Sequence, residues 1–219
     1  MAGGGEVVTL QAVLAWIDGF AATVAENKDY LTKLDSAIGD ADHGINMNRG
    51  MRAALERLEA SPPDDIGAAL KTVGMAMVSK VGGASGPLYG TFFLQLAGPL
   101  AGKESVTLEE WAGGIRAAVS GVMARGKAEL GDKTMIDALV PAVEALEGAV
   151  TEGASIGDGL TRAADAAAQG MEATTPLVAR KGRASYLGER SAGHQDPGAT
   201  SSHLLMRTAA DTLAQSGQD

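Results

Sequence analysis

The chain has 219 residues, enough for one domain that buries about 70% of the surface of its unfolded chain. Aromatic residues make up only 4% of the sequence and cysteine is absent, which favours helix over strand and excludes disulfides and thiolate metal sites. The formal net charge of −9 opposes binding to nucleic acid or an anionic membrane, and no segment has the features of a membrane span or signal peptide, so we expect a cytoplasmic protein.

The first half of the chain is predicted to form a flexible start over residues 1–8 and then five helices. Thr9 is a good N-cap for the first helix, and Pro62-Pro63 ends the third. Asp64 or Asp65 precedes the fourth helix, which the glycines of residues 82–86 end. Apolar residues at helical spacing place the five helices at about 10–27, 28–36, 45–60, 66–81 and 88–100.

The second half is predicted to form four more segments and one long loop. Thr107-Leu-Glu-Glu110 is a capping box for a helix that reaches about residue 129. Asp132 or Thr134 caps the next helix, which contains Pro141, and Ser155 caps another that ends near residue 175. Residues 176–195 form a basic loop without regular structure. Asp196-Pro197 then begins a last helix to about residue 214, before a flexible tail over 215–219. The pattern predicts a single all-α domain of about eight helices.

The most specific motif is L-D-S-A-I-G-D-A-D-H-G, which places carboxylates at Asp35, Asp40 and Asp42 around two glycines. Hard oxygen ligands on a turning backbone are typical of Mg²⁺ or Ca²⁺ sites. Helix capping explains these aspartates equally well when they are considered alone. An EF-hand is excluded because Met51 stands where that loop requires a bidentate Glu. Since Mg²⁺ usually takes ligands from substrate phosphates, three carboxylates suggest a ligand that carries phosphate.

Three further segments are compatible with phosphate or nucleotide binding, although each is also an ordinary turn or solvated loop. G-G-A-S-G-P at 82–87 joins two apolar helices, and its backbone N–H groups can approach an anion. The basic loop holds arginine and lysine, which contact phosphates well. R-G-K-A-E-L-G-D-K-T-M at 125–135 offers a methionine that can pack against a flat ring. P-loop, protein-kinase and nucleophile-elbow motifs are absent from the sequence.

Taken together, these segments resemble the L subunit of dihydroxyacetone kinase, which is also the nucleotide domain of single-chain kinases of that family. The matching stretches are G-D-A-D-H-G-I-N-M, K-V-G-G-A-S-G-P-L-Y-G-T, R-G-K-A-E-L-G-D-K-T-M-I-D and A-R-K-G-R-A-S-Y-L-G-E-R-S followed by H-Q-D-P-G-A. The resemblance implies a single antiparallel barrel of eight helices over 1–219 with the nucleotide at one end.

The resemblance also implies roles for individual residues. Asp35, Asp40 and Asp42 would coordinate two Mg²⁺ ions that bridge the phosphates of ADP or ATP, and together with Arg183 they form the expected catalytic set. The residues expected to contact the nucleotide are His43, Gly44, Ile45, Asn46, Ala84, Ser85, Gly126, Met135, Arg183, Asp196, Pro197 and Gly198.

The function implied by the resemblance is that of a phosphotransferase subunit. It would pass phosphate to dihydroxyacetone held on a separate K subunit, with ADP as a bound coenzyme that a phosphotransferase-system M subunit recharges from phosphoenolpyruvate. The alternatives are a unit that exchanges ATP and serves another keto-sugar, and a non-catalytic regulatory module, since L subunits can contact a transcription regulator. The sequence leaves open the keto-sugar, the choice between ADP and ATP, and the oligomeric state.

Overall fold

The computed structural model describes residues 6–213. The predicted tail at 215–219 and the first five residues of the predicted flexible start lie outside the described part. Val8, which belongs to that predicted start, is fully buried and pairs with Val106 in a small antiparallel ribbon. The ordered chain therefore already includes Val8.

The described chain is helical apart from one two-stranded ribbon. The strands are β1 (Val8–Thr9) and β2 (Ser105–Val106), and η1 (Arg183–Ser191) is a 3₁₀ segment. The α-helices are α1 (Leu10–Glu26), α2 (Lys28–Ile38), α3 (His43–Ala60), α4 (Ile66–Lys80), α5 (Ser85–Ala97), α6 (Leu108–Gly126), α7 (Ile136–Glu152), α8 (Ile156–Ala173) and α9 (Pro197–Leu213). The search of residues 6–213 finds no helix that is long and apolar enough to cross a membrane.

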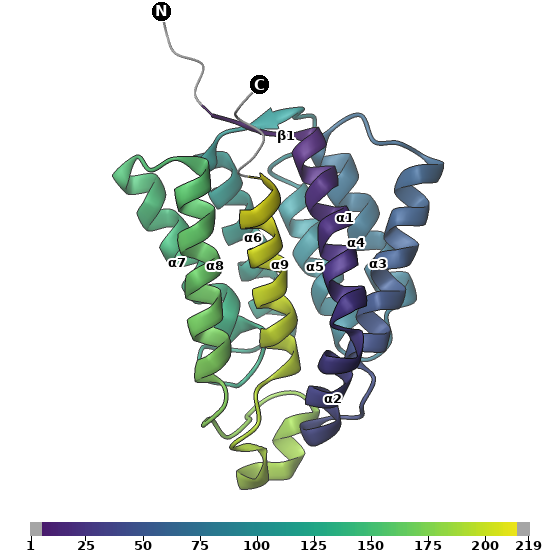
Figure 1. Cartoon of the computed structure of the whole chain (residues 1–219), viewed down its shortest axis with the longest axis vertical. Helices are drawn as coiled ribbons and strands as arrows, with labels where there is room; N and C mark the ends of the chain where they lie inside the picture. Colours follow the sequence, from purple (N-terminus) through teal and green to yellow (C-terminus); the bar gives the residue numbers. More distant parts are fainter. Residues whose placement is uncertain (1–5, 214–219) are drawn as a thin grey trace, which may run out of the picture.

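Eight of these helices form a closed ring, in agreement with the predicted antiparallel barrel. Each helix of the series α1, α3, α4, α5, α6, α7, α8, α9 packs against the next, and α9 packs against α1. The short helix α2 extends beyond the end of the ring (Figure 1). Because α1 and α9, at the two ends of the described chain, close the ring, the barrel forms only when the chain is folded over its full length.

Aromatic side chains fill the middle of the barrel. Trp16 of α1 meets Trp111 of α6 edge to face, with ring centroids 5.4 Å apart, and Phe93 of α5 lies 6.0 Å from Trp16. All three side chains are at least 99% buried. The indole Nε1 of Trp16 donates to the carbonyl of Leu205 in α9 at 3.1 Å. The few aromatic residues of this sequence are thus concentrated where helices from opposite sides of the ring meet.

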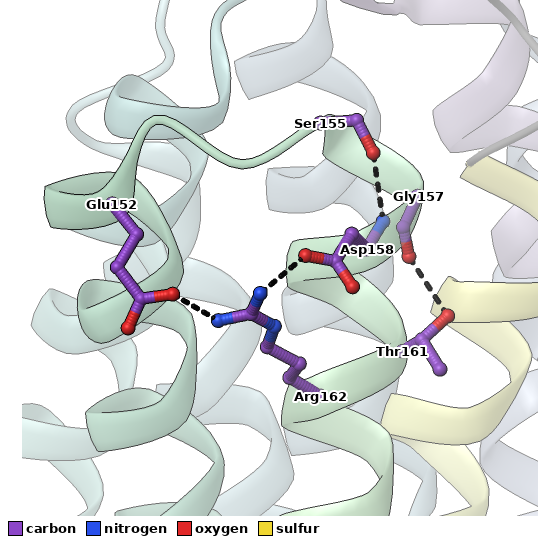
Figure 2. Close-up of polar contacts among 6 residues, drawn as sticks. All are labelled: Glu152, Ser155, Gly157, Asp158, Thr161 and Arg162. Carbon is purple, nitrogen blue, oxygen red and sulfur yellow. Dashed lines mark hydrogen bonds and ion pairs between the residues drawn. The ribbon is translucent and has the colours of Figure 1, made fainter.

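Most helix starts lie where the capping residues predict them. Thr9, Asp65 and Ser155 each accept a hydrogen bond from a backbone N–H three residues later, and the capping box at Thr107 is formed. Figure 2 shows the junction of α7 and α8, where the Ser155 hydroxyl accepts from the N–H of Asp158. These caps satisfy N–H groups that have no partner inside the helix.

Several predicted element boundaries and one predicted loop were wrong. Helix α5 begins at Ser85 instead of Leu88, so the Gly-rich turn runs directly into the first helical turn. Helix α7 begins at Ile136, and neither Asp132 nor Thr134 is its N-cap, because the Asp132 carboxylate accepts from the N–H of Glu129 within the preceding turn. The basic loop predicted without structure contains η1, whose 3₁₀ turns lack the apolar periodicity that marks an α-helix.

Candidate nucleotide and metal site

All four motifs identified in the sequence lie at one end of the barrel. Because consecutive helices of the ring run in opposite directions and α2 lies between α1 and α3 at one end, the connections after α2, α4, α6 and α8 fall at that same end. That end is the one opposite the β1–β2 ribbon in Figure 1, where α2 and η1 lie. The antiparallel arrangement therefore brings together segments that are up to about 150 residues apart in the sequence.

The three aspartates converge at this end. One carboxylate oxygen from each of Asp35, Asp40 and Asp42 lies within 4.8 Å of the others. Two ligands of a single Mg²⁺ ion stand at most about 4.2 Å apart, so this spacing needs only a small side-chain rotation to hold a cation. The residues present thus fit a magnesium site, and three clustered negative charges favour a cation between them.

The backbone around the cluster is tightly constrained. Oδ2 of Asp35 accepts hydrogen bonds from the N–H groups of Asp42 and His43, at 2.8 and 3.1 Å. A Cβ atom at Gly39 would stand 2.0 Å from Oδ1 of Asp35, so only glycine fits there. Ala41 adopts a left-handed conformation with φ of 61°, which turns the chain from Asp40 to Asp42. Asp35 therefore shapes the loop by accepting hydrogen bonds from two of its backbone N–H groups.

His43 links the aspartate loop to the Gly-Ala-Ser-Gly turn. Its Nδ1 lies 2.9 Å from the hydroxyl of Ser85, and its Nε2 lies 2.8 Å from the hydroxyl of Ser201. The Ser201 hydroxyl is in turn 2.7 Å from the hydroxyl of Tyr89. Burial lowers the pKa of His43 to about 4, although Asp35 and Asp42 act in the opposite direction, so the ring is neutral at pH 7. A neutral ring between two hydroxyls fixes the position of Ser85 without adding positive charge.

Two adjoining hollows extend from the aspartates. The first, which we call the polar hollow, is lined by the three carboxylates, Ser85 and Arg183, and it reaches the segment Asp196–Gly198. The second is mainly apolar and lies between the ends of α5 and α6, with Val122, Gly126 and Met135 among its walls. The two hollows share six lining residues, namely Ala84, Leu88, Thr134, Met135, Lys181 and Gly182. A charged compartment continuous with an apolar one suits a ligand with phosphates at one end and a flat ring at the other.

Arg183 reaches the aspartate cluster from η1. Its Nη2 lies 3.1 Å from Oδ2 of Asp40, and its side chain is 65% exposed. An ion pair this exposed contributes little to stability. Its position matters more, because it places a guanidinium at the mouth of the polar hollow.

Residues 37–211 match the model of the DAK2 domain. This chain belongs to the DAK2 domain family.

Relatives of this DAK2 domain include separate subunits of its own length. It is 48% identical over 198 residues to the PEP-dependent dihydroxyacetone kinase ADP-binding subunit DhaL of Escherichia coli K12, covering 90% of this chain and 94% of the relative. It is 40% identical to the PTS-dependent subunit DhaL of Lactococcus lactis, covering 95% of this chain and all of the relative. The resemblance to L subunits is confirmed.

Solved structures show the same fold within longer chains. The dihydroxyacetone kinase of C. freundii in complex with AMP-PNP and Mg²⁺ superposes with a TM-score of 0.69 at 26% identity. The match covers 96% of this DAK2 domain and 36% of that kinase. The native form of the same kinase gives a TM-score of 0.71.

Most predicted site residues of this DAK2 domain line the two hollows. Those that do are Asp35, Asp40, Asp42, His43, Ala84, Ser85, Gly126, Met135, Arg183, Asp196, Pro197 and Gly198. Three do not. Gly44 lies against the carbonyl of Lys28, Ile45 is 49% exposed, and Asn46 is buried and accepts from Arg49. Contact with a nucleotide stays a prediction for all of the expected site residues.

Sequence reasoning missed several lining residues. Leu88, Tyr89, Lys133, Thr134, Lys181 and Gly182 all line the hollows, and none is among the residues expected to contact the nucleotide. Lys133 and Thr134 lie in the segment 125–135, which was predicted to contact a nucleotide ring through its methionine. The sequence pattern thus identified the segment without identifying these two residues. Tyr89 carries no sequence signal, because a tyrosine on an apolar helix also packs in a core.

Proposed function

We propose that this chain is the ADP-binding phosphotransfer subunit of a phosphoenolpyruvate-dependent dihydroxyacetone kinase. The observation that carries the proposal is the convergence of three carboxylates at the mouth of a polar hollow that continues into an apolar one. The names of relatives that are 40–48% identical over at least nine tenths of this chain support the same function.

Asp35, Asp40 and Asp42 would hold two Mg²⁺ ions between the protein and the nucleotide phosphates. Bound Mg²⁺ would neutralise phosphate charge and align the transferring group. The geometry supports this role, since Asp35 is buried and fixed by two N–H groups, whereas Asp40 is exposed toward the hollow.

The other residues position the nucleotide. Helix α5 begins at Ser85, which lines the hollow together with Ala84, and the dipole at a helix N-terminus favours phosphate. The Ser85 hydroxyl, held by His43, would donate to a phosphate oxygen. Arg183 would move from Asp40 to phosphate as the metals bind, because both metal and guanidinium compete for the same carboxylate. Gly126 and Met135 would hold the adenine ring.

Dihydroxyacetone would come from a partner. The nucleotide and its metals would occupy the two hollows. The keto-sugar would therefore be held on a K subunit, which presents it beside the carboxylates. An M subunit would return phosphate from phosphoenolpyruvate to the bound ADP.

The test is the isosteric change Asp40→Asn or Asp42→Asn, which removes one negative charge from the cluster. Either change should abolish Mg²⁺-dependent retention of ADP and lower phosphoryl transfer about 100-fold or more, while the circular dichroism spectrum stays unchanged. Asp29→Asn is the matched control, because Asp29 is an exposed aspartate of α2 outside the cluster.

The assay itself separates the alternatives. Transfer to dihydroxyacetone is measured with K subunit plus either ATP, or M and phosphoenolpyruvate, and erythrulose serves as the second sugar. Tight ADP binding in excess chelator, or normal transfer by Asp42→Asn, would contradict the metal role.

A further inference from the structure

Lys133 is a buried lysine in the turn between α6 and α7. Only 1% of its surface is exposed, and its backbone is left-handed with φ of 63°. Burying an ammonium group is costly unless its protons are all satisfied. A strained and buried lysine next to the hollows therefore needs a specific set of partners.

Those partners are four backbone carbonyls. Nζ of Lys133 donates to the carbonyls of Thr174 at 2.8 Å, Leu177 at 3.0 Å and Thr175 at 3.3 Å, and also to that of His194. An ammonium has three protons, so one is shared between two of these oxygens. The first three carbonyls follow α8 and the fourth precedes α9.

The four carbonyls stand at the two ends of one excursion of the chain. We call residues 178–193 the arm; it contains η1, which begins at Arg183, and the preceding residues Lys181 and Gly182. Two further bonds join the same ends, from the N–H of Gly193 to the carbonyl of Thr175 at 2.8 Å and from the N–H of Asp196 to Oγ1 of Thr174 at 3.1 Å. Lys133 thus holds the two ends of the arm together.

The turn that carries Lys133 is itself held in place. The Asp137 carboxylate accepts from the N–H groups of Gly131 and Thr134, at 2.6 and 2.7 Å. The carbonyl of Asp132 accepts from the N–H of Arg180 in the arm at 3.1 Å. Burial lowers the pKa of Lys133, while the nearby Asp196 and Asp137 raise it and so favour its charge. The α6–α7 turn and the arm form one connected unit through Lys133.

We propose that Lys133 is a positioning residue, whose four hydrogen bonds hold the arm closed over the two hollows so that Arg183 and the Asp196–Gly198 segment are ready to receive the nucleotide. The proposal rests on the function proposed above. The side chain acts on backbone carbonyls rather than on the ligand, so its loss should lower the fraction of molecules with the arm in place. The apparent affinity for the nucleotide falls in proportion to the fraction of molecules with the arm in place. A saturating concentration of nucleotide returns the arm to its closed position.

The experiment compares Lys133→Met with Lys127→Met in the otherwise unchanged chain. Methionine keeps the length of the lysine stem and removes the donors. Lys127 is an exposed lysine of the same turn, also left-handed with φ of 49°, and is the matched control. ADP binding is measured by calorimetry in excess Mg²⁺, and backbone hydrogen exchange is measured without nucleotide.

The expected result for Lys133→Met is a dissociation constant raised about tenfold or more at unchanged stoichiometry. Transfer at saturating nucleotide should change less than about threefold. Amide exchange should speed up about tenfold or more over residues 175–195 while α1 and α4 keep their protection. Lys127→Met should match the wild type in each measurement.

Three outcomes would overturn the proposal: reduced stoichiometry at an unchanged dissociation constant, faster exchange in every helix, or no change in the arm. If Lys133→Met does not fold, Lys133→Gln, which keeps two donors without charge, is measured in the same way. Failure of the wild type to bind Mg-ADP would refute the proposed function instead, and the exchange comparison would still test the closure of the arm.

Discussion

Gly39 shows how one residue sets the geometry of the aspartate cluster. Its N–H donates to the carbonyl of Asp35 at 2.6 Å and ends α2, and the space where a Cβ would stand is filled by the Asp35 carboxylate. Because that carboxylate is also held by two backbone N–H groups, it cannot turn away freely. The glycine therefore allows the close approach of side chain and backbone on which the cluster depends.

Gly39→Ala should therefore weaken Mg-ADP binding roughly tenfold or more, because Asp35 must leave its position to make room for the methyl group. Calorimetry with and without Mg²⁺ measures this. Gly148→Ala in α7 is the control, since a Cβ there meets nothing within 4 Å, and it should be neutral or stabilise by up to about 1 kcal/mol. Wild-type affinity in Gly39→Ala would show that the cluster tolerates a displaced Asp35.

The first turn of α8 shows which interactions fix the start of a helix. In Figure 2 the hydroxyl of Ser155 caps the helix, while Arg162 bridges Glu152 of α7 and Asp158 of α8. The cap satisfies a backbone N–H directly. The ion pairs are between side chains that are 42–63% exposed, so water and salt screen them.

Ser155→Ala should accordingly lower the free energy of unfolding by about 1 kcal/mol, because an N–H of the first turn loses its acceptor. Arg162→Gln should cost less than about 1 kcal/mol, and its effect should shrink further in 0.5 M salt. Urea denaturation at low and high salt measures both variants. A larger loss for Arg162→Gln than for Ser155→Ala would reverse this ranking.

The closed ring joins the two ends of the described chain through Trp16. Its ring packs on Trp111 and Phe93, and its indole N–H reaches Leu205 in α9. The contacts of this one side chain connect α1 with α5, α6 and α9. The barrel should therefore unfold as one cooperative unit.

Trp16→Ala should destabilise the protein by about 3–5 kcal/mol, through lost burial and the cavity left behind. That is a large share of the roughly 5–15 kcal/mol typical of a folded domain. Thermal and urea denaturation should show it in a single transition. Tyr186→Ala is the control, since this side chain is 87% exposed, and it should change stability by less than about 0.5 kcal/mol. Two separate transitions in Trp16→Ala would contradict cooperative unfolding.

The sequence by itself determined the helical class, the approximate position of nearly every helix, and the aspartates as the candidate metal ligands. Local rules are sufficient for these: capping residues, prolines and apolar spacing act within one or two turns. The boundaries that were wrong, at Leu88 and in the basic loop, lie where a Gly-rich turn or a 3₁₀ segment follows no apolar period. The site residues were named largely through the family resemblance, since each motif alone also fits an ordinary turn.

Only the tertiary structure decided how these motifs meet. The antiparallel ring brings the connections after α2, α4, α6 and α8 to one end, and it places His43 between Ser85 and Ser201. It also places the ammonium of Lys133 among carbonyls 41 to 61 residues away in the sequence. Every residue type has a backbone carbonyl, so the sequence gives no sign of which carbonyls will accept from this lysine. Its partners can be identified only in the folded chain.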